Sequence, residues 1–255
     1  MALAIDIGNT NIVLGCFHGE EIEFIARIAT ERNRTAEQYA AEIKSIIQLY
    51  DKDPKNIEGS IISSVVPPLT TVLKHAVERI TGKTPMIVGP GLKTGLNIKI
   101  DNPAQLGADM VVTAVAGIRK YPLPQIIIDM GTATTFSVIS GKGEFLGCSI
   151  MAGVNLSLNA LSGGTAQLPA IDLSNPKKVC GSNTIDSMTS GAVYGNASMV
   201  DGMIDRLSEE LGEEMTVIAT GGISKLITPH CKHSIILNDD LLLQGLAMLY
   251  YKNKK

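Results

Sequence analysis

The sequence lacks an apolar run near the roughly 20 residues that a helix needs to cross a bilayer, although 45% of its 255 residues are hydrophobic. It also lacks an excess of basic residues, since its formal net charge is −3. This balance excludes the broad basic field on which many nucleic-acid binders rely. No basic region precedes the first apolar segment, so we expect no secretory signal. We therefore expect a cytoplasmic protein with sizeable cores and with neither nucleic acid nor a membrane as partner.

Closely spaced cysteine pairs are missing as well. The four cysteines are scattered along the chain, at Cys16, Cys148, Cys180 and Cys231. Without a C-x-x-C pair, and in a reducing compartment, they are expected to be free thiols. Cys231 does lie between His230 and His233, but the group follows a proline in a polar connection and has no distant matching pair. An ordinary surface loop is favoured there over a metal site.

One short pattern occurs twice, as AIDIGNTNIVLGCF at residues 4–17 and as IIDMGTATTFSVIS at residues 127–140. Each copy is an apolar strand, then Asp-x-Gly, then small hydroxyl or amide residues, then a second apolar strand. The acids Asp6 and Asp129 lie roughly half the chain apart, so each half carries one copy of the unit. Two ordinary hairpin turns are the alternative interpretation. The matched pair favours a duplication whose facing copies form a cleft.

The residues at these turns suit an anion. Gly8 and Gly131 have the permissive backbone that lets N–H groups approach phosphate closely. Hydroxyl and amide side chains beside them can donate to phosphate oxygens, and these are Asn9, Thr10, Asn11, Thr132, Thr134 and Thr135. A carboxylate next to polyphosphate needs a cation between them, so the two acids predict a metal-bridged nucleotide.

Periodicity predicts an α/β protein with mixed sheets flanked by helices. The expected strands are 2–8, 11–18, 21–28, 59–66, 85–88, 96–100, 125–130, 134–139, 143–150 and 216–219. Helices are expected after the capping box of Thr35 and Gln38, and at 68–80, 103–118, 154–161 and 187–211. Asn102 is expected to cap the 103–118 helix, which Pro103 begins.

Residues 163–186 show no periodicity and are rich in Gly, Pro, Ser and Asn. A stretch of that length inside a domain is usually functional or mobile, so it is a candidate lid or subunit contact. The 187–211 helix carries an apolar stripe that favours core or a dimer face over a cofactor site.

Five motifs in order carry a family resemblance. They are D-I-G-N-T-N at 6–11, S-S-V-V-P at 63–67, D-N-P-x-x-L-G-A-D at 101–109, D-M-G-T-A-T-T at 129–135 and T-G-G at 220–222. Together they resemble type III pantothenate kinase, of the acetate and sugar kinase, Hsp70 and actin superfamily. The resemblance implies two duplicated ribonuclease-H-like (actin-like ATPase) domains, residues 1–118 and 119–255, with ATP in the cleft between them.

The resemblance also implies roles for individual residues. The first phosphate loop would comprise Asp6, Ile7, Gly8, Asn9, Thr10, Asn11, Ile12 and Val13, with Thr132 as a second phosphate contact. Asp129 would bind the monovalent cation, K⁺ or NH₄⁺, that this family requires besides Mg²⁺. Asp109 would accept the proton of the primary hydroxyl of pantothenate as it attacks the γ-phosphoryl group.

The implied pantothenate contacts are Ile100, Gly107, Ala108, Asp109, Met110 and Thr184. Thr184 resembles the residue that reaches pantothenate in a neighbouring subunit, so the resemblance implies a homodimer. Two positions depart from the family, which usually has Arg at Met110 and commonly Tyr at Ile100. Loss of a guanidinium partner for the pantothenate carboxylate weakens binding by roughly 1.5–3 kcal/mol.

Three functions therefore stay open. The first is ATP-dependent phosphorylation of pantothenate to 4′-phosphopantothenate, the step that commits it to coenzyme A. The second is a related kinase acting on another small hydroxylated acceptor, and the third is a nucleotide-binding regulatory protein without turnover. An actin-like filament protein fits less well, because such chains usually carry extra subdomains. Retention of Asp6, Asp109 and Asp129 favours an enzyme, although one fold hosts many functions.

Overall fold

A computed structural model describes residues 1–254, which form two compact units. The first unit contains Met1–Leu96, Asp101–Ala116 and the chain from Asp240 onward. The second contains Asn97–Ile100 and Gly117–Asp239.

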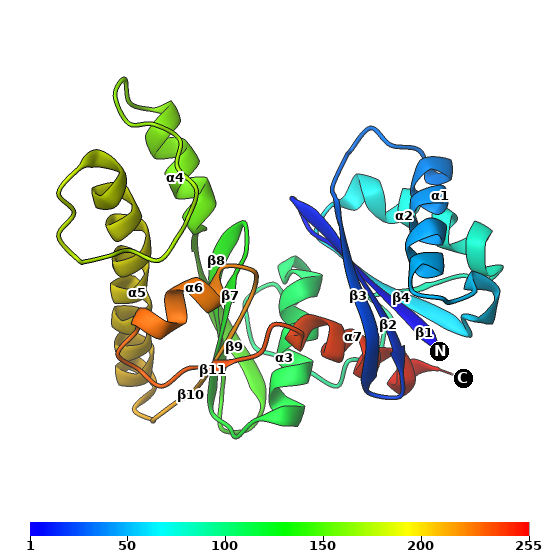
Figure 1. The fold of residues 1–255 in the computed structure, drawn as a ribbon. Helices are drawn as coiled ribbons and strands as arrows, with labels where there is room; N and C mark the ends of the chain where they lie inside the picture. The colour runs from blue at the N-terminus through cyan, green and yellow to red at the C-terminus, as the bar shows by residue number, and fades with distance from the viewer. Residues whose placement is uncertain (255) are drawn as a thin grey trace. The chain divides into compact units, whose positions relative to one another are not determined.

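The first unit is built on a five-stranded sheet of order β3-β2-β1-β4-β5 (Figure 1). Its strands are β1 (Ala2–Ile7), β2 (Asn11–His18), β3 (Glu21–Ala29), β4 (Gly59–Ser64) and β5 (Met86–Ile87). β1 is antiparallel to β2 and parallel to β4. Alternate residues of β1 enter two different cores, because successive side chains point to opposite faces of a sheet.

The helices of this unit are α1 (Ala36–Leu49), α2 (Pro67–Thr81) and α7 (Leu241–Asn253), together with the start of α3 (Ala108–Lys120) and the short 3₁₀ turns η1 (Pro54–Asn56) and η2 (Pro103–Gln105). Leu3, Ile5 and Ile7 pack with α1 and α2, whereas Ala2 and Ala4 pack with α7. α1 begins with the predicted capping box, since Thr35 and Gln38 each bond the other's backbone N–H.

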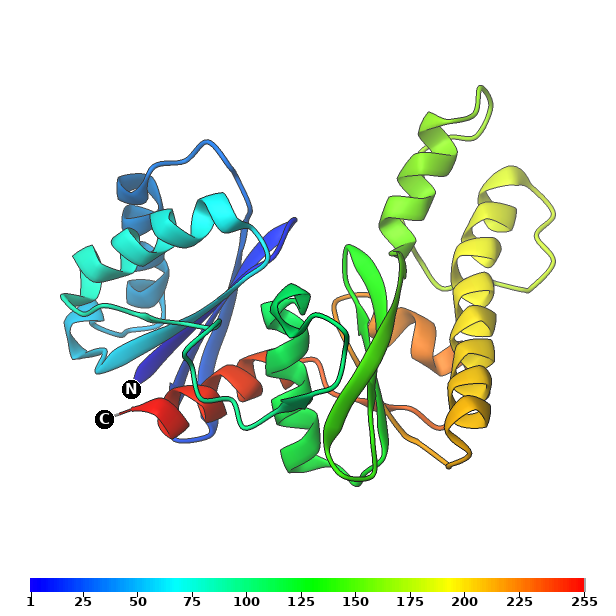
Figure 2. The same cartoon turned by 180° about the vertical axis from the view of Figure 1, so that it is seen from behind.

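The second unit contains a six-stranded sheet of order β11-β10-β7-β8-β9-β6. Its strands are β6 (Asn97–Ile98), β7 (Gln125–Met130), β8 (Ala133–Ile139), β9 (Glu144–Ala152), β10 (Thr216–Thr220) and β11 (Ile236–Leu237). The helices are α4 (Val154–Gly163), α5 (Thr184–Leu211), α6 (Ser224–Ile227) and the 3₁₀ turn η3 (Thr228–His230). Figure 2 shows the same chain from behind. Ile126, Ile128 and Met130 of β7 share a core with apolar residues of α4 and α5.

The two sheets repeat one arrangement. In each, a central strand has an antiparallel hairpin partner on one side and a parallel strand on the other: β1 lies between β2 and β4, and β7 lies between β8 and β10. The order β3-β2-β1-β4-β5 therefore matches β9-β8-β7-β10-β11, with β6 added beyond β9. The predicted α/β class with duplicated mixed sheets is confirmed.

Three details differ from the sequence-based expectations. The expected split at residue 118 assigned the C-terminal residues to the second domain, but Leu243, Leu246 and Tyr250 of α7 pack in a core of the first unit. The expected 103–118 helix is two elements, η2 and α3, because Leu106 has an extended backbone at ψ 126°. Thr184 was placed in the long loop but is the first residue of α5, after the N-cap Asn183.

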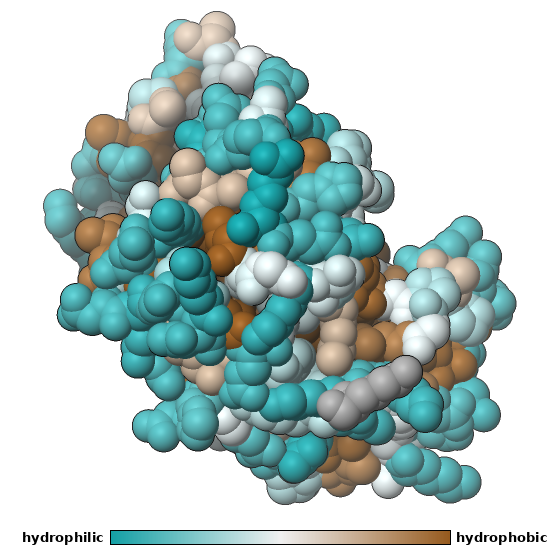
Figure 3. Space-filling view, turned by 90° about the vertical axis from the view of Figure 1, so that its right-hand side faces the viewer, coloured by the Kyte–Doolittle hydropathy of each residue, from teal (hydrophilic) through white to brown (hydrophobic). Residues whose placement is uncertain are grey.

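Within residues 1–254, the helices are too short or too polar for any of them to cross a membrane. The face drawn in Figure 3 is mostly hydrophilic, with apolar residues in small separate groups. Large exposed apolar side chains include Leu156 and Leu161 of α4 and Ile185 of α5.

Candidate functional site

The tip of the β1–β2 hairpin presents polar side chains on a tightly closed backbone. The Gly8 N–H donates to the Asn11 carbonyl oxygen at 3.0 Å, and a Cβ on Gly8 would lie 3.0 Å from that same oxygen. Asn9, Thr10 and Asn11 are exposed, whereas Ile7 and Ile12 on either side are buried. Buried apolar residues thus anchor a loop of exposed donors, the arrangement expected for a phosphate loop.

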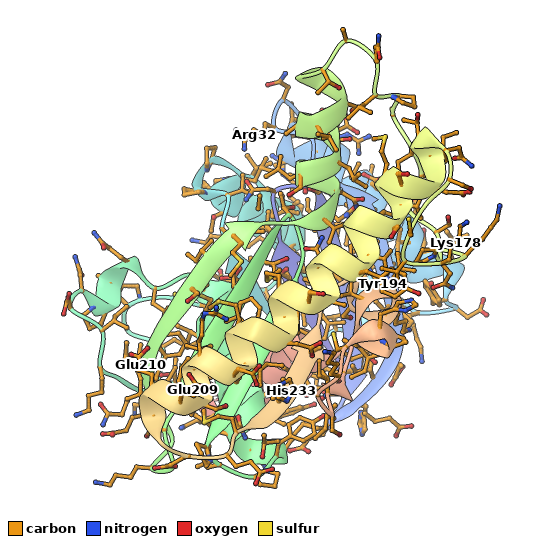
Figure 4. All side chains as sticks on the ribbon, turned by 90° about the vertical axis from the view of Figure 1, so that its left-hand side faces the viewer. Arg32, Lys178, Tyr194, Glu209, Glu210 and His233 are labelled. Carbon is orange, nitrogen blue, oxygen red and sulfur yellow. The ribbon has the colours of Figure 1, made fainter. Side chains whose placement is uncertain are left out.

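The segment after β3 braces this tip. Thr30 donates its Oγ1 proton to the Gly8 carbonyl oxygen at 2.8 Å and its N–H to the Thr10 carbonyl oxygen at 3.0 Å. Arg32, labelled in Figure 4, approaches the Asn9 side-chain oxygen at 3.4 Å. These bonds order the backbone of the loop before a ligand binds. The entropy cost of ordering the loop on binding is therefore small.

Asp109 lies in the first turn of α3, where the helix dipole favours an acid. One of its carboxylate oxygens, Oδ1, accepts the Met110 N–H at 2.8 Å. The side chain is partly buried, and burial raises the pKa of the Asp109 carboxyl even though this hydrogen bond lowers it. A carboxylate with reduced hydration and a fixed orientation suits proton acceptance.

Val65, which follows β4, contacts both the end of β1 and the residues just before Asp109. The Val65 N–H donates to the Ile7 carbonyl oxygen at 3.1 Å, directly before Gly8. The Val65 side chain lies 4.0 Å from the point that a Cβ on Gly107 would occupy. Asp6 and Asp109 therefore come to the same end of the first sheet, which the sequence motifs did not establish.

The β7–β8 hairpin repeats the first tip in the second unit. The Gly131 N–H donates to the Ala133 carbonyl oxygen at 3.0 Å. Asp129 pairs with Thr135 across the hairpin and with Thr220 on the parallel strand, as Asp6 pairs with Val13 and Ser63. Thr132 is exposed at the tip, where its hydroxyl can meet a phosphate.

Two glycines that the sequence interpretation gave no role press against this second tip. Gly221 has φ +92°, and a Cβ there would lie 2.5 Å from Asp129 Oδ1 and 2.7 Å from the Met130 backbone. A Cβ on Gly153 would lie 2.4 Å from the Gly131 carbonyl oxygen. The T-G-G motif was the only sequence signal for Gly221, and Gly153 had none.

These oxygens fit a cation of modest charge. Among residues 1–254, no three His, Cys, Asp or Glu side chains gather as a metal site. The Asp129 carboxylate and nearby backbone oxygens are hard ligands of the kind that K⁺ and Mg²⁺ prefer. At the His-Cys-His segment, His233 Nε2 lies 2.8 Å from Asp205 Oδ1, and the His230 ring packs edge-on to the ring of Tyr194. His233 and Tyr194 are labelled in Figure 4.

Thr184 lies in a groove of about 740 Å³ between α4 and α5. Val154 also lines this groove, and it follows Gly153, whose N–H donates to the Thr132 carbonyl oxygen at 3.0 Å. The groove therefore includes Val154, the residue directly after the glycine that donates to the second hairpin tip.

Basic residues lie along the chain near the two positions that depart from the family, Met110 and Ile100. Met110 is partly buried in the first turn of α3, while Arg119 and Lys120 end the same helix, roughly 14 Å further along its axis. Ile100 follows β6, where the Lys99 ammonium pairs with Glu144 at 3.4 Å.

Comparisons with known proteins agree with this geometry. The family model for type III pantothenate kinase matches residues 2–206. Type III pantothenate kinase from Halalkalibacterium halodurans is 44% identical over 99% of this chain and 100% of its own length. The enzyme of that name from Exiguobacterium sp. is 44% identical over 100% of this chain and 100% of its own length.

A solved structure supports the fold. MreB 5 of Spiroplasma citri bound to AMPPNP has a TM-score of 0.57 at 12% identity, covering 98% of this chain and 95% of the other. This likeness confirms the actin-like architecture and says nothing further about activity. By the family model and the full-length relatives, the chain belongs to the type III pantothenate kinase family.

Proposed function

We propose that this protein transfers the γ-phosphoryl group of ATP to the primary hydroxyl of pantothenate, giving 4′-phosphopantothenate and ADP in coenzyme A biosynthesis. The observation that carries the proposal is the presence of two Asp-x-Gly hairpins in a chain 44% identical to type III pantothenate kinases over its whole length.

Asp109 acts as the proton acceptor. The acceptor oxygen forms a bond to the γ-phosphorus as the bond between that phosphorus and the β,γ-bridging oxygen breaks, and ADP leaves. The hydroxyl proton passes to the Asp109 carboxylate. Its bond from the Met110 N–H supports an orienting role, because phosphoryl transfer depends mainly on positioning and charge stabilisation.

The two hairpin tips bind the nucleotide phosphates. Residues Asp6–Val13 supply one loop and Thr132 a second contact, which agrees with the exposed donors and close glycines at both tips. Mg²⁺ would neutralise charge on the phosphates, and Asp129 would bind a K⁺ or NH₄⁺ ion. Cation dependence distinguishes this assignment from a purely structural role for Asp129.

The working enzyme is a homodimer in which Thr184 reaches pantothenate from the partner. Support comes from the α4–α5 groove that Thr184 lines and from the exposed apolar side chains of the same two helices, Leu156, Leu161 and Ile185. Large apolar side chains exposed to solvent commonly mark a subunit contact. Light scattering should give twice the monomer mass of 27.0 kDa, and a monomer at working concentration would contradict this assignment.

The test of the function is coupled ADP release with ATP, Mg²⁺ and pantothenate in K⁺, NH₄⁺ or Na⁺. We expect turnover that depends on pantothenate and is faster with K⁺ or NH₄⁺ than with Na⁺. ATP binding without turnover on any acceptor would instead support a regulatory protein.

A second candidate is phosphorylation of a different hydroxylated acceptor. It is favoured by Met110, where the family usually has Arg, together with the placement of Arg119 and Lys120 at the far end of α3. Turnover on another alcohol with little on pantothenate would establish it.

A further inference from the structure

Gly107 occupies the position directly before α3 and has no conformational need to be glycine. Its φ lies outside the left-handed region that favours glycine. Its carbonyl oxygen accepts the Val111 N–H at 3.1 Å, so it holds the N-cap place of the helix. Ser, Thr, Asp or Asn at such a place would cap the helix and stabilise it.

What excludes a side chain at this position is the Asp109 carboxylate. A Cβ on Gly107 would lie 2.4 Å from Asp109 Oδ1, well inside contact distance. The same Oδ1 accepts the Met110 N–H at 2.8 Å. The next nearest obstacles are Asp109 Cγ at 3.6 Å and Val65 at 4.0 Å, which are ordinary contacts.

We infer that Gly107 is a positioning residue, whose missing side chain leaves the space in which the Asp109 carboxylate is held for proton acceptance. This inference rests on the proposed function, since it takes Asp109 as the proton acceptor. It differs from the role that the family resemblance implied for Gly107, which is direct contact with pantothenate. When a Cβ is added at Gly107, the nearest atom belongs to the end of the flexible Asp109 side chain. We therefore expect the Asp109 carboxylate to move while the backbone stays in place.

The experiment compares Gly107→Ala and Gly107→Ser with wild type. Because the backbone at 107 accommodates a side chain, the melting temperature should be unchanged or slightly raised. kcat should fall about tenfold to hundredfold, the size of effect that a small misplacement of a catalytic group produces. KM for ATP should stay near the wild-type value, because the phosphate loop is untouched.

Gly141→Ala is the matched control. Gly141 lies in the exposed β8–β9 turn, where an added Cβ would make only an ordinary contact with Glu213 at 3.5 Å. It should leave kcat and both KM values unchanged. Wild-type kcat in both Gly107 variants, or a loss of kcat that tracks a loss of folded protein, would overturn the inference.

A second readout does not require turnover. The ¹³C carboxyl resonance of Asp109, titrated in the protein without ligands, should give a pKa above the usual range in wild type. The pKa should differ in Gly107→Ala, because a displaced carboxylate gains water, which lowers its pKa, and leaves the Met110 N–H, which raises it. Identical titrations would overturn the inference. Absence of wild-type turnover on pantothenate would contradict the proposed function and leave this titration to decide the role of Gly107.

Discussion

The Val65 N–H donates to the Ile7 carbonyl oxygen at 3.1 Å, and this bond continues the β1–β4 pairing to the end of the sheet. The next residue after Ile7 is Gly8 of the first hairpin tip, and the Val65 side chain faces Gly107 beside Asp109. Val65 therefore contacts both the strand that leads into the proposed phosphate-binding loop and the residue position beside Asp109, the proposed proton acceptor.

Gly221→Ala is expected to disrupt the second hairpin. The left-handed φ of +92° strains any residue with a Cβ, by about 1–3 kcal/mol, and that Cβ would also meet Asp129 and the Met130 backbone. Gly222→Ala is the control, because a Cβ there has nothing within 4 Å. Denaturant unfolding should show a lower free energy of unfolding for Gly221→Ala alone. Equal stability of the two variants would contradict this packing.

Met110→Arg should strengthen binding of pantothenate. A guanidinium can hold the carboxylate through two parallel hydrogen bonds. Restoring such a charge-assisted partner is expected to lower KM for pantothenate about tenfold to hundredfold, corresponding to roughly 1.5–3 kcal/mol. Steady-state kinetics would measure it, with Met110→Lys to separate charge from bidentate geometry. An unchanged KM would show that another group already binds the carboxylate.

Asp201→Ala should destabilise the second unit. The Asp201 side chain is buried in α5 and accepts the Lys232 N–H at 2.9 Å and the His233 N–H at 3.2 Å. Loss of these hydrogen bonds to a charged group costs about 1.5–3 kcal/mol. Asp205→Ala, which removes an exposed pairing with His233, should cost about 0–1 kcal/mol. Equal costs measured by urea unfolding would count against this role for Asp201.

Glu58 predicts a dependence of stability on pH. Hydrogen bonds from the Lys254 ammonium and the amino terminus lower the pKa of the Glu58 carboxyl to about 2. Its unfolded pKa is about 4.3, so this contribution is present above that pH and is lost as the pH falls toward 2.

Thermal unfolding of wild type and Glu58→Gln between pH 2 and 7 would measure this contribution. The stability difference between them should be present near neutral pH and should shrink as the pH approaches 2. A difference that does not change with pH would contradict the assigned ion pairs.

Local signals in the sequence predicted much of the fold. The capping box at Thr35 and the hairpin at each Asp-x-Gly depend on residues close in sequence, and both are present in the structure. The assignment of α7 to the first unit could not be read locally, because it depends on packing against strands more than 150 residues earlier.

Parts of the candidate site also depend on contacts that the sequence does not reveal. The signal at Asn102 and Pro103 fits a single 3₁₀ turn as well as a long helix, so the break before α3 was missed. Gly153 closely approaches the tip between β7 and β8, and Gly221 closely approaches the end of β7. Both contacts join residues far apart in sequence, so local patterns do not reveal them. The roles of Asp109, Asp129 and Thr184 stay predictions until they are measured.

The most direct test of the account is formation of 4′-phosphopantothenate, followed by mass spectrometry, with wild type and Asp109→Asn. Asn is similar in size to Asp, and its side-chain oxygen can still accept the Met110 N–H, but it is not a proton acceptor. The account predicts product from wild type and a rate about 10²–10⁴-fold lower for Asp109→Asn, with ATP binding retained. Product formation at the wild-type rate by Asp109→Asn would contradict it.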